Sequence, residues 1–208
     1  MNLFHNLSVL TSEQNTRTTN AQPTMTTIIY CDPQADSFNH EILNSITTGL
    51  TDEGREHTLI NLYGEHFNPV LESAMPVNLT TADVQARRYA QTLARTNQLI
   101  LIFPIWWGAG PAMLKGFIDK AFVKGIVYDT TPEGAVMPCL SISHTEIITT
   151  SEEQTSTIAS YIMGYFAPIT LTSVGINGVK WSNLDYISHR TPAQRSQFIA
   201  ELLSRILA

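Results

Sequence analysis

Short runs of apolar and β-branched residues alternate with segments of helical periodicity from Met25 onward. The runs predict strands, which span residues 26–31, 57–62, 99–103, 136–143 and 169–176. Capping residues and helical spacing predict a helix after each strand or at the end of the chain. The expected helices span residues 38–50, 111–122, 152–166 and 192–207, and a further one begins at a cap at Thr80 or Thr81 and ends at residue 95. Ser37 and Thr191 would cap the first and the last of these helices, and Pro111 would open the helix 111–122. The run 99–103 is apolar throughout, which is typical of a parallel strand covered on both faces.

This alternation predicts an α/β fold with a doubly wound, five-stranded parallel sheet and helices on both faces. The expected strand order is 2-1-3-4-5. In such sheets a ligand binds at the carboxyl ends of the strands, where the strand order reverses. Three loops would surround that crevice: residues 32–39, 104–110 and 143–150.

The first 24 residues have a different character from the rest. Residues 11–24 are polar and show no periodicity, so we expect residues 1–24 to be disordered and residues 25–208 to form one domain. The segment is either a non-essential extension or an artefact of a true start at Met25. Mass spectrometry of the native protein distinguishes the two.

Charge and composition exclude several classes of function. The chain of 208 residues carries 12 Lys and Arg against 18 Asp and Glu, a formal net charge of -6, so we expect no nucleic-acid partner. No apolar run approaches the roughly 20 residues that span a bilayer. Only 14% of residues are charged, which favours an oligomer. The two cysteines, Cys31 and Cys139, require no oxidising compartment, so a cytoplasmic location is expected.

The first loop leads into a helix start. Free N–H groups and the helix dipole at Ser37, Phe38 and Asn39 favour an anion, such as a ligand phosphate. No glycine-rich phosphate loop is present. An ordinary capped helix is an equally good interpretation of these residues.

The second loop is rich in aromatic residues and glycine. Trp106 and Trp107 follow Pro104 and Ile105 at the end of the third predicted strand, and Gly108 leaves space above them. Such a loop suits a flat ring system. The alternative is that the tryptophans belong to the core, and we expect this of one of the two.

Here the chain resembles a known family. The run FPIWWGAGPAMLKGFIDKAFVKGIVY, residues 103–128, resembles the signature of the NAD(P)H:quinone oxidoreductases with a flavodoxin-like fold. Further similar segments are Asp36-Ser37-Phe38-Asn39, Leu62-Tyr63, Phe67-Asn68-Pro69, Leu140-Ser141-Ile142 and HRTPAQR at 189–195. Together they cover nearly everything after Met25.

The resemblance implies a bound flavin, FMN or FAD, with FMN slightly favoured. Its phosphate would lie over Ser37, Phe38 and Asn39, and its ring system on Pro104, Ile105, Trp106 and Trp107. The loop carrying Ser143, His144 and Thr145 would lie at the pyrimidine end. The family's homodimers would bring Tyr128 towards the neighbouring subunit's flavin. The implied reaction is two-electron reduction of quinones or related acceptors by NAD(P)H, in ping-pong order.

Several residues depart from the family pattern. Asp32 replaces a usual histidine, and Asp36 adds a second carboxylate; either would repel a phosphate if it points inward. Ser143-His144-Thr145-Glu146 stands where the family shows T-T-G-G. As an imidazolium, His144 could offset charge on the reduced flavin or protonate a quinol; otherwise it is a surface histidine.

These departures keep two alternatives open. One is a regulatory subunit on the same fold with little catalysis, of the potassium-efflux type. The other is a relative that has lost the flavin. The choice between NADH and NADPH also stays open, since Arg190 and Arg195 are candidates only for flavin or dimer contacts.

Overall fold

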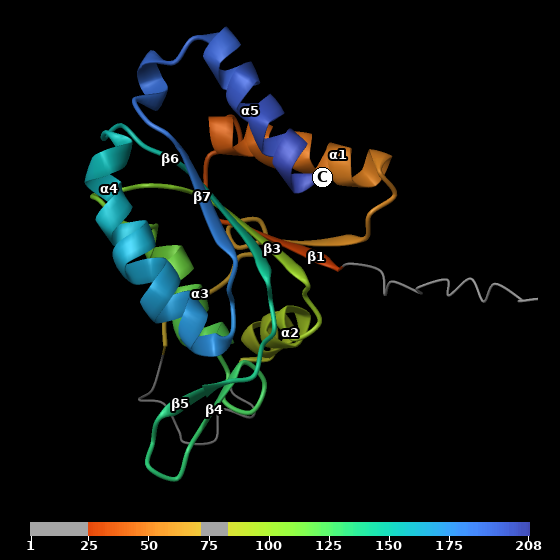
Figure 1. The fold of residues 1–208 in the computed structure, drawn as a ribbon, viewed down its shortest axis with the longest axis vertical. Coiled ribbons are helices and arrows are strands. Elements are labelled where there is room, and N and C mark those ends of the chain that lie inside the picture. The colour runs from red at the N-terminus through yellow and green to blue at the C-terminus, as the bar shows by residue number, and fades with distance from the viewer. Residues whose placement is uncertain (1–24, 72–82) are drawn as a thin grey trace, which may run out of the picture.

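A central parallel sheet organises the molecule. The computed structural model describes residues 25–71 and 83–208. The sheet strands stand in the order β2 (His57–Asn61), β1 (Thr26–Tyr30), β3 (Gln98–Pro104), β6 (His144–Thr150) and β7 (Val179–Leu184). Every neighbouring pair is parallel. The predicted fold class and strand order are confirmed (Figure 1).

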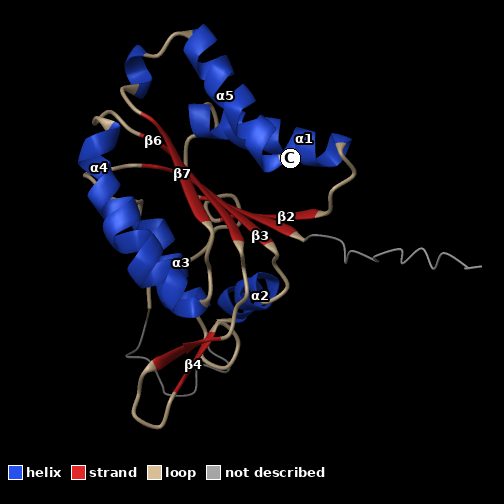
Figure 2. Ribbon diagram, viewed as in Figure 1, coloured by secondary structure: helices blue, strands red, loops and turns tan. Residues whose placement is uncertain are grey.

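Helices cover both faces of this sheet (Figure 2). One face carries α1 (Phe38–Asp52) and α5 (Pro192–Ile206), and the other carries α2 (Val84–Leu93), α3 (Ala112–Ala121) and α4 (Thr155–Tyr161). The alternation of side chains along a strand divides the core between them. In β1, Ile28 packs in the cluster under α1 and α5, while Ile29 packs in the opposite cluster.

Two helix starts agree with the sequence in detail. Ser37 caps α1 and its side chain accepts a hydrogen bond from the His40 N–H. Thr191 caps α5 in a reciprocal capping box with Gln194, and Pro192 opens the helix. The other caps differ by a few residues. Asp83 caps α2, whereas the predicted caps Thr80 and Thr81 lie outside the described residues, and Pro111 is itself the cap of α3.

The prediction that residues 136–143 form the fourth strand of the sheet is wrong. Val136–Pro138 forms β5, which pairs only with β4 (Tyr128–Thr130) in a two-stranded hairpin beside the sheet. The hairpin projects at one end of the molecule in Figure 1. All three residues of β5 are exposed, whereas β6 is buried from Thr145 to Thr150. Burial on both faces therefore selects the later segment for the sheet.

The fifth predicted strand, 169–176, is also wrong. After α4, the chain continues through a π-helix, Ile162–Leu171, and a 3₁₀ turn, Thr172–Val174. Some of its apolar residues are buried in the core cluster on this face of the sheet, namely Ile162, Phe166, Leu171 and Val174. Gly175 ends this segment at φ 92°, where a Cβ atom would stand 2.0 Å from the Leu140 carbonyl oxygen, so only glycine fits.

Two further observations bear on the predictions. The extension predicted at residues 1–24 lies outside the described residues. Within 25–71 and 83–208, no helix is both long enough and apolar enough to cross a membrane.

Candidate functional site

A cavity of about 350 Å³ opens at the carboxyl ends of β1, β3 and β6. The chain passes from β1 to β2 on one side and to β3 on the other, so the strand order reverses here, which is where open α/β sheets bind ligands. The volume lies within the range of about 300–1,000 Å³ typical of small-molecule sites. The lining residues are Asp32, Gln34, Asp36, Ser37, Phe38, Asn39, Pro104, Ile105, Trp106, Thr150, Ser151, Glu152, Ile187, Ser188 and Arg195.

The start of α1 forms one wall of the cavity. The His40 and Glu41 N–H groups both donate to the Ser37 carbonyl oxygen. The N–H groups of Phe38 and Asn39 precede the helical hydrogen-bond ladder, so their natural acceptor is a group in the cavity. Ser37, Phe38 and Asn39, expected from the sequence to bind a phosphate, all line this wall.

Asp32 is held by internal hydrogen bonds. Its two carboxylate oxygens accept from the Gln34 N–H and from the Asn39 Nδ2 atom, each at 2.9 Å. The same Asn39 Nδ2 lies 3.0 Å from Thr150 Oγ1. Asp32 thus accepts hydrogen bonds from two N–H groups, while Asp36 stays exposed at the rim.

Arg195, on α5, contributes the cation of this cavity. Its guanidinium lies over the Phe38 ring, 5.4 Å from the ring centroid, and its Nη2 atom donates to the Ile187 carbonyl at 2.9 Å. Its Nε atom is buried and has no hydrogen-bond partner, alone among side-chain atoms of the described ranges. A buried donor without an acceptor is costly, and the guanidinium that carries it lines the cavity, so an anionic group is favoured beside Arg195.

The strand-to-helix turn after β3 forms the second wall. Pro104, Ile105 and Trp106 line the cavity, and Ile105 is fixed by its N–H donating to the Thr150 carbonyl at 2.8 Å. Trp106 exchanges two backbone hydrogen bonds with Ala109.

Trp107 sits at the tip of this hairpin with φ 52° and is fully exposed. It does not line the cavity, in contrast to the expectation for this residue. Trp106 is 41% exposed, so the expectation that one of the two tryptophans is core is also wrong.

The third wall differs most from the prediction. Ser143, His144 and Thr145 stand at the amino end of β6, where His144 pairs with Gln98 at the start of β3. Since Thr150 pairs with Pro104, six residues of strand, or about 20 Å, separate His144 from the cavity. The three residues are therefore not brought to the site, and His144 instead hydrogen-bonds its neighbour Ser143.

Thr150, Ser151 and Glu152 take their place. The β-branched run Ile147-Ile148-Thr149-Thr150 is the signal that could have located them. The residues after β6 are Ser151, Glu152 and Glu153, so the glycines typical of the resembled family are absent here as well.

A polar network supports this wall from the edge strand β7. The Asn183 Nδ2 atom donates to Ser151 Oγ and to Thr155 Oγ1, each at 3.0 Å, and its Oδ1 atom accepts from Thr149 Oγ1 at 2.8 Å. Thr155 also donates through its N–H and hydroxyl groups to Asp185, which pairs with Arg190. Burial raises the pKa of Asp185, but these donors outweigh it and hold that pKa below its usual value.

Tyr128, on β4, lies outside the main cavity. It lines a separate hollow of about 280 Å³ with Leu71, Ile118, Asp119 and Phe122. Its expected approach to a neighbouring subunit's flavin stays a prediction.

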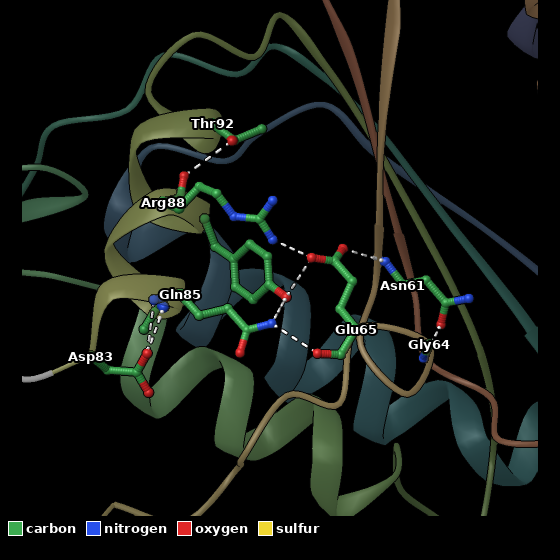
Figure 3. Close-up of polar contacts among 9 residues, drawn as sticks. Asn61, Gly64, Glu65, Asp83, Gln85, Arg88 and Thr92 are labelled. Atoms are coloured by element: carbon green, nitrogen blue, oxygen red, sulfur yellow. Dashed lines mark hydrogen bonds and ion pairs between the residues drawn. The ribbon is translucent and has the colours of Figure 1, made fainter.

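A second polar cluster anchors the loop that follows β2 (Figure 3). The Glu65 carboxylate accepts from the Asn61 N–H at 3.2 Å and from the Tyr89 hydroxyl at 3.2 Å, and it pairs with Arg88. Gln85 adds a hydrogen bond to the Glu65 carbonyl. The cluster joins the loop to α2, and in it the Arg88 guanidinium is paired with the Glu65 carboxylate.

Comparison with known proteins places this chain in a family. A family model described as "Flavodoxin-like fold" matches residues 24–205. The chain therefore belongs to the flavodoxin-like family.

Individual relatives agree with this assignment. An uncharacterized NAD(P)H oxidoreductase of Escherichia coli, YcaK, is 29% identical over 108 residues, which cover 49% of this chain and 54% of that protein. The FMN-dependent NADH:quinone oxidoreductase 2 of Clostridium acetobutylicum is 29% identical over 50% of this chain and 52% of its own length. The chain spans about half the length of the curated relatives it matches.

A solved structure is similar over a longer range. The crystal structure of Smu.1420 from Streptococcus mutans has a TM-score of 0.74 and 28% identity, covering 87% of this chain and 97% of that one. The likeness therefore extends over most of this chain.

Proposed function

We propose that this protein is a flavin-dependent NAD(P)H oxidoreductase that reduces quinones or related acceptors by two electrons in ping-pong order. The observation that carries the proposal is the Arg195 side chain, which lines the same cavity as the start of α1 and carries a buried Nε atom without a hydrogen-bond partner. Together they form a site for an anionic group at the point where the strand order reverses. Relatives named for NAD(P)H oxidation and FMN dependence support it.

The residues present fit a flavin with one terminal phosphate, FMN. The Phe38 and Asn39 N–H groups and Arg195 would bind the phosphate, and the backbone from Pro104 to Trp106 would orient the ring system. The flavin, when bound, supplies the two-electron chemistry between NAD(P)H and the acceptor. The protein contributes binding and orientation, and Thr150 and Ser151 close the third side. His144 has no part in this proposal, because it lies at the opposite end of β6.

We further propose a cytoplasmic homodimer. The π-helix exposes three large apolar side chains, Met163, Tyr165 and Ile169, which a second copy could cover. Cys31 and Cys139 are unbridged, which is compatible with a reducing compartment.

The regulatory alternative has one specific observation in its favour. Asp32, Asp36 and Glu152 line the cavity with carboxylates, which disfavours negative charge on a reduced cofactor. A flavin that stays bound but is not reduced by NADH or NADPH would support this alternative.

The visible absorption spectrum of the purified protein tests the proposal. We expect a two-banded flavin spectrum that bleaches anaerobically with a nicotinamide nucleotide and returns on addition of a quinone. Replacing the Arg195 side chain, as in R195M, removes a charge-assisted hydrogen bond of about 1.5–3 kcal/mol, so the Kd of FMN should rise about tenfold or more. The exposed R95M variant is the matched control. A protein that binds neither FMN nor FAD contradicts the proposal.

A further inference from the structure

The cavity has a marked imbalance of charge. Three carboxylates line it, those of Asp32, Asp36 and Glu152, against the single cation Arg195. Asp36 is exposed at the rim, where an incoming charged substrate first meets it. Arg195 is already engaged with Phe38 and the Ile187 carbonyl, and its free Nε atom is buried. It is therefore poorly placed to meet a second anion at the rim.

Several other cations of the described residues are paired with carboxylates. Arg190 pairs with Asp185 beside the third wall, and Arg88 pairs with Glu65 after β2. On α3, Lys115 pairs with Asp119, and Lys120 pairs with Asp83 and also donates to the Asn68 carbonyl at 2.7 Å.

The residues outside the described ranges add only one basic residue. Residues 72–82, ESAMPVNLTTA, contain no Lys or Arg, and residues 1–24 contain only Arg17. Among the residues that line the cavity, Arg195 is the one Lys or Arg, within a chain of net charge -6.

NADH and NADPH differ only in the 2′-phosphate of the adenosine ribose. A phosphate monoester carries about -1.5 to -2 charges near neutral pH and is bound by Arg or Lys side chains. We infer that this protein uses NADH in preference to NADPH, because carboxylates outnumber cations among the residues that line its cavity and so disfavour the additional 2′-phosphate. The inference rests on the proposed function and names the electron donor of the same site. Repulsion of this kind raises the KM and the Kd of NADPH while leaving the transfer step itself intact.

Steady-state kinetics of the FMN-loaded protein test the inference. We expect kcat/KM to be about tenfold or more higher for NADH than for NADPH at low ionic strength, with the difference in KM. The ratio should fall as salt is raised, because salt at about 0.15 M screens charges beyond about 8 Å. Calorimetric titration with the unreactive NAD⁺ and NADP⁺ should show the same order of Kd values.

Substitutions at the rim provide the sharper test. The D36K variant reverses an exposed charge of the cavity, and Q34R adds a cation at a neighbouring exposed position. Both should lower the NADH/NADPH ratio about fivefold or more by improving NADPH. The D52K variant makes the same change of charge at the other end of α1, also exposed, and should leave the ratio unchanged.

The outcomes separate the two proposals. Equal kcat/KM values for the two nucleotides, or a ratio that responds neither to salt nor to D36K and Q34R, overturn the preference for NADH and leave the oxidoreductase proposal standing. Failure to bind FMN or FAD overturns both.

Discussion

The side-chain amide of Asn39 donates to the Asp32 carboxylate at 2.9 Å and so joins the start of α1 to the end of β1. Both residues are buried, and the same amide nitrogen reaches Thr150 at the end of β6. One side chain thus holds two strand ends and a helix start in register around the cavity.

The N39A variant should therefore be destabilised. It leaves the buried Asp32 carboxylate without one of its two donors, which costs about 1–3 kcal/mol of the free energy of unfolding. Urea denaturation followed by circular dichroism measures this cost. The N44A variant, at an exposed position of the same helix, should lie within about 0.5 kcal/mol of the unmodified protein. Equal stability of the two variants would show that the Asp32–Asn39 contact contributes little.

Removing Arg205 should have a larger effect. Its Nε and Nη2 atoms donate to the Glu146 carboxylate at 3.0 and 2.8 Å, and Nη2 also donates to Ser182 Oγ. Glu146 is 6% exposed in the middle of the sheet, so R205M strands a buried charge at a cost of about 3–5 kcal/mol. The double variant E146M/R205M should recover most of the loss, as measured by the urea midpoint. No recovery would mean that the loss arises from packing and not from the stranded carboxylate.

Asp185 should make stability depend on pH in the acid range. Its pKa lies below the ordinary value of 3.8, so its ionised form stabilises the folded state above that value. This contribution is lost as the pH falls through the lowered pKa. The Tm of D185N should therefore lie well below that of the unmodified protein at pH 6, and the gap should narrow towards pH 3. A gap that is constant across this range would contradict the lowered pKa.

The two cysteines should differ in reactivity. Cys31 is fully buried, and burial together with the nearby Asp32 raises its pKa to about 12, whereas Cys139 is exposed. A thiol reagent should label one equivalent quickly in the folded protein and two after denaturation. The C139S variant should lose the fast phase. Rapid labelling of two thiols in the native state would show that the end of β1 opens readily.

Asn183 should act on cofactor binding through the third wall. The N183A variant removes both donors that hold Ser151 and Thr155, so the loop after β6 loses its fixed position. We expect the Kd of FMN to rise about threefold to tenfold, with altered visible circular dichroism of the bound flavin. The exposed N177A variant is the control. An unchanged Kd and an unchanged spectrum in N183A would remove this loop from the site.

Local patterns predicted the first three strands of the sheet and the caps of α1 and α5. They failed at β6 because its centre contains Glu146, a residue that is costly to bury alone. The compensating Arg205 lies 59 residues further along the chain, on α5, and no local pattern reveals that pairing. Because of this error, the third wall of the cavity was predicted at Ser143, His144 and Thr145, whereas Ser151 and Glu152 form it.

The prediction of a strand over residues 169–176 failed for a related reason. The β-branched residues of this segment favour a strand in isolation, but burial of Leu171 and Val174 against the sheet selects the helical form. The first two walls were predictable because a helix cap and a strand end are local features. The position of Trp107 was not, since the φ of 52° that turns it outward depends on the geometry of the Trp106–Ala109 hairpin.

The residues that line the cavity are far apart in the sequence, from Asp32 near the start of the fold to Arg195 on the last helix. A ligand bound there would contact α1, β3, β6 and α5 together, so local opening of any one of these elements would cost the binding free energy of the ligand. Occupancy should accordingly slow amide hydrogen exchange across the entire sheet and not only at the loops that the ligand contacts. The bound cofactor would then stabilise these elements together and make unfolding more cooperative.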